Sequence, residues 1–116
     1  FNVVSKIEAV NSKNELSSII DVSDGILLAR GDMAIYMSQF NPLNICKQIS
    51  EEAIGKRLFG ATDILLGLQN NLMPSRAEIM DYYLLLDLGC TDIILTNFLK
   101  NGKRIYKYIY DSIYKK

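Results

Sequence analysis

Short apolar runs alternate with longer segments of helical periodicity along this chain of 116 residues. The apolar runs lie at residues 1–8, 26–29, 57–61 and 92–95, and their lengths are typical of strands rather than helices. A segment with helical spacing follows each of them. Strands that are joined through helices become parallel neighbours in one sheet. The pattern therefore predicts an α/β fold made of four βα units with a parallel sheet.

The segments between the apolar runs carry signals that start and stop helices. Ser12 with Glu15, and Ser75 with Glu78, form the S-x-x-E capping box, in which the serine hydroxyl accepts a backbone hydrogen bond. Another segment begins at the Asn-Pro pair 41–42, and a glycine stops it. Apolar residues follow at helical spacing: Leu16, Ile19 and Ile20; Ile45, Ile49 and Ala53; Ile79, Tyr82 and Leu86; Ile105, Ile109 and Ile113.

Composition excludes several kinds of chemistry. The chain has no histidine, and its two cysteines match no CxxC pattern, so most metal sites and nucleophiles based on these residues are excluded. The two thiols are expected to be free, as in a cytosolic protein. Thirteen basic residues balance thirteen acidic ones, so no overall charge attracts nucleic acid or an anionic membrane. The apolar runs are too short to span a bilayer.

Length and chain ends indicate a part of a larger protein. At 116 residues the chain holds at most one domain, and 49% hydrophobic with 22% charged residues is ordinary for a packed core. The chain begins without methionine and within a strand-type run. We therefore expect a segment of a longer polypeptide, cytoplasmic in location, with an organelle as the alternative because the N-terminus is absent.

Two acidic residues follow strand-type runs at equivalent places. Glu8 ends the first run, and Asp32 follows the second. Because the C-terminal ends of parallel strands meet at one edge of a sheet, these carboxylates are expected to form a divalent-metal site there. Lys6 lies two residues before Glu8, so its side chain points to the same side. The alternative is a solvated strand end at Lys6 and Glu8, with Asp32 capping a helix or turn.

Two further residues at the predicted strand ends permit two interpretations each. Gly31 allows backbone N–H groups to approach a ligand closely, or it only makes the turn. Thr62 follows the third run, where its hydroxyl either donates to a phosphate or satisfies the turn. The residues alone do not decide between these roles.

Four sequence signatures in series resemble those of pyruvate kinase. They are SKIE at 5–8, SDGILLARGDM at 23–33, GK-x₄-AT at 55–62 and MPSRAE-x₂-D at 73–81. In that family the segments read approximately KIEN, DGIMVARGDLG, GKPVxxATQM and PTRAExxDVANA. Order and spacing agree over nearly the whole chain, which makes the set far more specific than any single motif. The resemblance implies a (β/α)₈ TIM barrel, of which residues 1–116 supply the second half, strands five to eight.

The resemblance also implies roles for individual residues. Lys6 matches the catalytic lysine that stabilises the transferring phosphoryl group and the enolate oxygen, and Thr62 matches the threonine beside that site. Glu8 and Asp32 match the two carboxylates that hold the divalent metal. This metal is normally Mg²⁺, with Mn²⁺ as the alternative. The ligands of K⁺, if it is used, are expected to lie outside this chain.

A substrate site and an activity follow from the same resemblance. Ala29, Gly31 and Asp32 match the turn whose backbone helps bind the substrate carboxylate, next to Thr62. The implied reaction is the glycolytic transfer of a phosphoryl group from phosphoenolpyruvate to ADP, which gives pyruvate and ATP. These substrates are the expected partners, together with other copies of the protein in a homo-oligomer, and neither nucleic acid nor a membrane. The 116-residue chain alone is expected to be inactive because half of the pocket is missing.

The departures from the family concern mainly the last loop. The glutamine that follows AT in the family is Asp63 here, and residues 96–105 replace the SGETAxGxYP segment after the last strand. That replacement removes a glutamate at Phe98 and a proline at Ile105. The chain is thus a divergent match, and two alternatives stay open. One is a non-catalytic relic or assembly module that retains a metal or phosphate site. The other is a different Mg²⁺-dependent barrel enzyme acting on pyruvate or phosphoenolpyruvate, such as a lyase.

Overall fold

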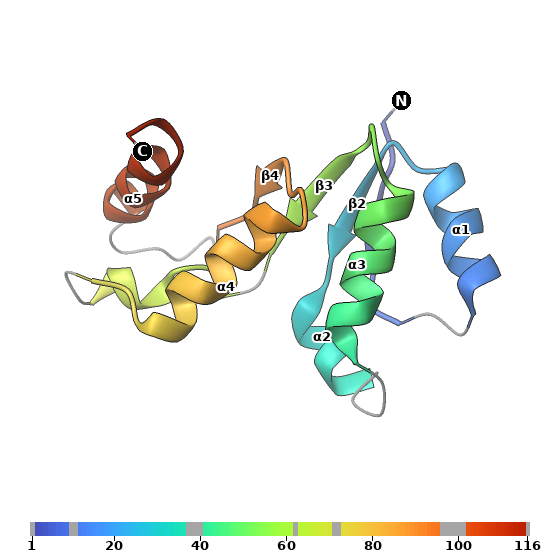
Figure 1. Cartoon of the computed structure of the whole chain (residues 1–116), viewed down its shortest axis with the longest axis horizontal. Helices are drawn as coiled ribbons and strands as arrows, with labels where there is room; N and C mark the ends of the chain where they lie inside the picture. Colours follow the sequence, from blue (N-terminus) through green and yellow to red (C-terminus); the bar gives the residue numbers. More distant parts are fainter. Residues whose placement is uncertain are drawn as a thin grey trace.

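The computed structural model describes residues 2–9, 12–36, 41–61, 63–70, 73–95 and 102–115. Within this part, a parallel sheet runs in the order β1 (Val4–Ile7), β2 (Gly25–Leu28), β3 (Arg57–Gly60) and β4 (Asp92–Ile93). The helices are α1 (Lys13–Asp21), α2 (Arg30–Tyr36), α3 (Pro42–Glu52), α4 (Arg76–Asp87) and α5 (Gly102–Tyr114), with a short 3₁₀ helix η1 (Leu66–Gln69). Strands and helices alternate along the chain, which confirms the α/β fold with a parallel sheet (Figure 1).

The helix-start signals of the sequence are present as hydrogen bonds. Ser12 Oγ accepts the N–H of Glu15 at 3.1 Å. Ser75 Oγ accepts the N–H of Glu78 at 3.2 Å, and the Glu78 carboxylate accepts the N–H of Ser75 at 3.1 Å, so α4 has a complete capping box. Asn41 caps α3 with its side-chain oxygen. These bonds satisfy backbone donors that a helix start leaves free, and α1, α3 and α4 therefore begin where the sequence indicates.

The sequence pattern does not predict α2 and η1. The alternative role for Asp32 is to cap a helix or turn, whereas Asp32 lies inside the first turn of a short helix over residues 30–36. Gly31 lowers the intrinsic helix propensity of this segment, so the local sequence does not predict a helix here. The helix buries Met33, and η1 buries Leu68 in the same way. Tertiary packing therefore decides the conformation of both segments.

The strand register separates two faces of the sheet. Adjacent parallel strands with right-handed connections place their connecting helices on one face. On that face Ile26 and Leu28 have exposed fractions of 0%, and Ile7, which pairs with Leu28, is also buried. Val4 points to the opposite face, because side chains alternate along a strand, and it is 46% exposed. Within the described residues, the helices thus cover one face of the sheet and leave the other open.

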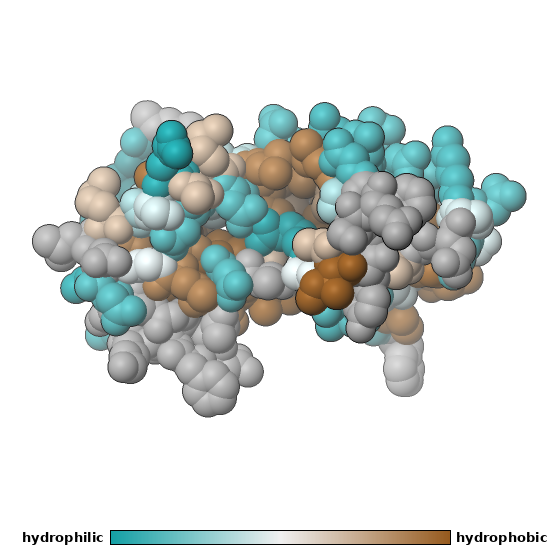
Figure 2. Space-filling view, turned by 90° about the horizontal axis from the view of Figure 1, so that it is seen from below, coloured by the Kyte–Doolittle hydropathy of each residue, from teal (hydrophilic) through white to brown (hydrophobic). Residues whose placement is uncertain are grey.

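The core lies between the sheet and its helices. Its fully buried side chains include Leu16 of α1, Ile49 of α3 and Leu85 of α4. Seen from below, apolar residues also reach the surface in the middle of the molecule (Figure 2). Among the described residues, no helix combines the length and the apolar character needed to cross a membrane.

Candidate active site

Three charged residues meet at the C-terminal edge of the first two strands. Lys6 lies on β1, Glu8 directly follows β1, and Asp32 lies in the first turn of α2, after β2. The ammonium nitrogen of Lys6 is 2.8 Å from Glu8 Oε1 and 3.4 Å from Asp32 Oδ2. Because Ile7 pairs with Leu28, β1 and β2 end at the same level, and this register brings the charged residues together. We call these three residues the Lys6 cluster.

The Lys6 cluster is open to solvent. The side chains of Lys6, Glu8 and Asp32 are 54%, 44% and 41% exposed. Hydrogen bonds to Glu8 and then to Asp32 raise the pKa of Lys6, so its ammonium group is charged at neutral pH. Solvent-exposed ion pairs of this kind contribute little to folding stability. The Lys6 cluster therefore presents one ammonium group and two carboxylates to solvent, where a charged ligand can reach them.

The donors of the Lys6 cluster fit a hard divalent cation that keeps part of its water shell. Mg²⁺ is usually held by one or two carboxylates together with waters and substrate oxygens. Glu8 Oε1 and Asp32 Oδ2 contact the same ammonium nitrogen, at 2.8 and 3.4 Å. The distance between these two oxygens is therefore at most the sum of the two contacts. In the part of the chain that the structure describes, no group of three or more acidic or cysteine side chains could hold a metal ion. The described residues therefore do not form a complete set of protein ligands for a metal ion, and Glu8 and Asp32 are the two carboxylate donors there.

The backbone of the Ala29–Asp32 turn is partly used within the protein itself. The N–H of Ala29 donates to the carbonyl of Ile7 at 3.2 Å, and the carbonyl of Ala29 accepts the N–H of Met33 at 2.9 Å. Ala29 therefore holds the start of α2 against the end of β1. Gly31 is next to Asp32 in the first turn of the same helix. Thr62, expected beside this turn, lies outside the described residues, so its position stays a prediction.

Arg30, to which the sequence pattern assigns no role, connects three elements at this edge. The Nε and Nη2 groups of Arg30 donate to the carbonyl of Ala61 at 3.1 and 2.8 Å, and Nη1 pairs with Asp81 of α4. Its side chain is only 18% exposed. Arg30 belongs to the ARGD signature and Asp81 ends the PSRAE-x₂-D signature. The signal was therefore present in the sequence, although nothing local indicates that these two residues meet.

Glu78 links the same region to η1. In addition to its capping bond, its Oε2 accepts the N–H of Gly67 at 2.6 Å. A Cβ atom on Gly67 would lie 2.4 Å from Glu78 Oε1, so a larger residue there would displace the Glu78 carboxylate. Burial opposes ionisation of Glu78, but the hydrogen bonds from Gly67 and Ser75 outweigh it and lower the pKa of the carboxyl group. Glu78 thus joins the segment after β3 to the start of α4.

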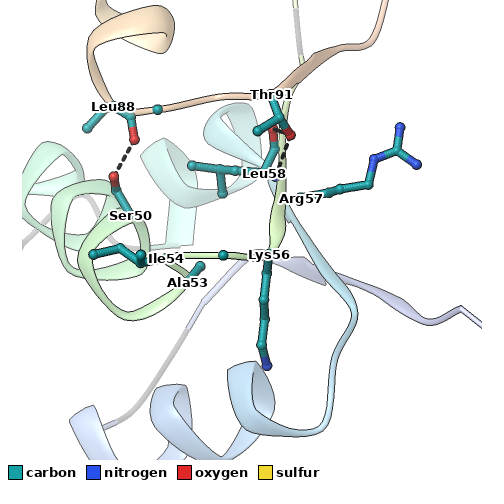
Figure 3. A pocket seen from close by; sticks show the side chains of 10 residues that line it. Ser50, Ala53, Ile54, Lys56, Arg57, Leu58, Leu88 and Thr91 are labelled. Carbon is teal, nitrogen blue, oxygen red and sulfur yellow. Dashed lines mark hydrogen bonds between the residues drawn. The ribbon is translucent and has the colours of Figure 1, made fainter.

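A hollow lies at the other end of the strands and does not share residues with the Lys6 cluster. It has a volume of about 400 Å³ and lies between the C-terminal ends of α3 and α4 (Figure 3). Two cationic side chains on its wall, Lys56 and Arg57, extend away from the hollow. Lys56 donates to the carbonyl of Ile20, and Arg57 pairs with Asp92. The hollow therefore offers mainly apolar walls and no charged group free for catalysis.

Neither thiol is suited to nucleophilic chemistry. Cys46 is buried, and its Sγ lies 3.9 Å from the sulfur of Met33. Burial raises the pKa of Cys46, and it raises the pKa of Cys90 to about 11. Both groups are therefore protonated at neutral pH, as expected for free structural thiols. This leaves the Lys6 cluster as the candidate site within the described residues.

The comparisons with known proteins agree on one family. A family model described as the barrel domain of pyruvate kinase matches residues 1–103. The pyruvate kinase of Mycoplasma pneumoniae is 31% identical over 107 residues, which cover 86% of this chain and 20% of that protein. The pyruvate kinase of Clostridium acetobutylicum is 38% identical over 103 residues, which cover 86% of this chain and 22% of that protein.

A solved structure gives the same result. The crystal structure of pyruvate kinase from Pyrobaculum aerophilum superposes with a TM-score of 0.75 and 26% sequence identity. The superposition covers 90% of this chain and 27% of that protein chain. The present chain thus spans about a fifth of the length of the curated relatives named above.

Proposed function

Because the chain belongs to the pyruvate kinase family, we propose that it supplies half of a pocket that transfers a phosphoryl group from phosphoenolpyruvate to ADP. The observation that carries this proposal is the Lys6 cluster at the C-terminal edge of the strands. Barrel enzymes build their active sites at that edge, from residues of several strand ends. Every relative named above is a pyruvate kinase, which favours this activity over that of a lyase.

The chemistry of phosphoryl transfer explains why these residue types suffice. The transition state spreads negative charge over phosphoryl oxygens, so catalysis requires alignment and positive charge more than a covalent nucleophile. Lys6 supplies a compact positive charge, held in place by two carboxylates. Glu8 and Asp32 are the residues that hold Mg²⁺ in this proposal, with Mn²⁺ as the alternative. The bound cation neutralises phosphate charge and polarises the enolate oxygen.

The substrate acid is proposed to lie against the Ala29–Asp32 turn. Since the N–H of Ala29 is engaged by Ile7, the backbone of Gly31 and Asp32 remains for contact with the substrate carboxylate. Thr62 is proposed to lie beside the transferred group. The remaining contacts, including any K⁺ ligands, belong to the first half of the barrel, outside this chain. Assembly of the complete protein as a homo-oligomer belongs to the same proposal.

A chimera tests the proposed function. The segment matched by residues 1–103 is exchanged into the Clostridium acetobutylicum pyruvate kinase, and pyruvate formation is measured with and without Mg²⁺. We expect Mg²⁺-dependent turnover, and we expect Lys6→Met to lower kcat much more than it raises KM, because the lysine acts most strongly on developing charge.

Lys13→Met is the matched control, since Lys13 is an exposed lysine at the start of α1 that does not belong to the Lys6 cluster. It should leave both kinetic constants unchanged. A folded chimera without turnover, or one whose kcat is insensitive to Lys6→Met, would contradict the proposal.

A further inference from the structure

We propose that Arg30 is a positioning residue that sets the turn after β3 relative to the Lys6 cluster. This inference rests on the proposed function and concerns a residue that does not itself contact the reacting groups. Three observations support it: the geometry of its hydrogen bonds, the strain in the turn that it holds, and its place two residues before Asp32.

The hydrogen bonds of Arg30 are directional. Two N–H groups of one guanidinium converge on the carbonyl oxygen of Ala61, and a third contacts Asp81. A planar guanidinium with two donors on one acceptor restrains the direction of that acceptor as well as its distance. Because the side chain is largely shielded from water, these bonds are screened less than those of an exposed arginine. Arg30 thus restrains the backbone where the chain leaves β3.

The backbone beyond Ala61 adopts an unusual conformation. Asp63 and Leu65 have positive φ angles of 54° and 53°, in the left-handed region that residues other than glycine rarely occupy. Such conformations persist only where the surroundings hold them, and they are frequent at functional sites. Leu65 is buried, which anchors the far side of this turn. Arg30 anchors its near side through the Ala61 carbonyl.

The position of Arg30 couples this turn to the cluster. Arg30 and Asp32 lie in the same short helix, α2, and Ala61 follows Gly60, which pairs with Leu28 at the end of β2. One side chain therefore connects the C-terminal ends of two neighbouring strands. Loss of the two bonds to Ala61 should let the turn relax away from Asp32 while Glu8 and Asp32 themselves stay in place. The expected result is a misaligned pocket that still binds a divalent cation.

The competing explanation is an ion pair that only joins α2 to α4. Two variants separate the explanations. Arg30→Lys keeps a positive charge for Asp81 but loses the two guanidinium hydrogen bonds to the Ala61 carbonyl. Asp81→Asn removes the ion pair and keeps the two hydrogen bonds from Arg30 to Ala61. A positioning role predicts the larger kinetic defect in Arg30→Lys, whereas a purely structural ion pair predicts it in Asp81→Asn.

The experiment uses the chimera described above. For each variant we would measure kcat and KM for phosphoenolpyruvate, the Mn²⁺ affinity by electron paramagnetic resonance, and the melting temperature. We expect Arg30→Lys to lower kcat on the order of 10²-fold, the scale of a misplacement near 1 Å, with Mn²⁺ affinity unchanged. Arg57→Gln is the control, because it breaks the Arg57–Asp92 pair at the opposite end of the strands. It should leave kcat unchanged.

A second measurement uses the same chimera and needs no activity. In amide NMR spectra, Arg30→Lys should shift the resonances of Ala61 and Asp63 more than Asp81→Asn does. Wild-type kcat in Arg30→Lys, or equal shifts in the two variants, would overturn the positioning role while leaving the proposed function intact. A folded wild-type chimera without turnover would overturn both.

Discussion

Replacement of Glu78 should measure how strongly the segment after β3 is tied to α4. The carboxylate accepts two backbone N–H groups, from Gly67 at 2.6 Å and from Ser75 at 3.1 Å. The neutral amide of Glu78→Gln has one oxygen acceptor, so one of these donors loses its partner. An unpaired donor in a partly buried place costs about 1–3 kcal/mol, and we expect Glu78→Gln to destabilise the protein by about 1–2 kcal/mol.

The alanine variant should be more severe. Glu78→Ala removes both acceptors and the reciprocal half of the capping box, so the expected loss is about 2–4 kcal/mol. Urea unfolding followed by circular dichroism measures these differences, at one fixed protein concentration because association makes apparent stability concentration-dependent. Glu51→Gln, on the exposed side of α3, is the matched control and should change stability by less than about 0.5 kcal/mol.

The effect of Glu78→Gln should depend on pH in a defined direction. Hydrogen bonds lower the pKa of Glu78 in the folded protein below its ordinary value of 4.5, so the unfolded chain binds the proton more tightly. The stabilisation is therefore fully present above about pH 4.5 and is lost as the pH falls through the folded pKa. The stability difference between the wild type and Glu78→Gln should shrink accordingly on acidification. A difference that is absent at pH 7, or that grows at low pH, would refute the reasoning.

Two further predictions concern the isolated 116-residue chain. The open sheet face exposes Val4 in the edge strand β1 and Ile94 directly after the edge strand β4, so the chain should associate or aggregate. Val4→Lys with Ile94→Lys should reduce this association. A light-scattering monomer whose melting temperature is independent of concentration would show that the sheet is closed by other means. Cys46 and Cys90 should react slowly with a thiol reagent at pH 7 and rapidly after unfolding, since burial raises the pKa of both. Fast reaction in the folded state would contradict the burial of Cys46 and the partial burial of Cys90.

Local signals in the sequence are sufficient for most of the fold. The capping box of Ser75 and Glu78 involves residues three apart, and its chemistry is the same in any helix start, so it could be read directly. The placement of Glu8 and Asp32 at one edge could be inferred as well, because parallel strands in register bring their C-terminal ends together, and both residues contact Lys6 there. Alternation along β1 placed Lys6 on the same side as Glu8. Thr62 lies outside the described residues, so its role stays a prediction.

Only the tertiary structure shows which distant residues meet. Arg30 and Asp81 are 51 positions apart, and neither carries a local sign of its partner. Helix α2 forms around Gly31 because Met33 gains burial in the core, and this gain outweighs the weak helix propensity of the segment. The second bond of Glu78, to Gly67, likewise depends on how η1 packs against α4. Periodicity and capping act over a few residues and can be read from the chain, whereas pairing across elements depends on the packed arrangement of all of them.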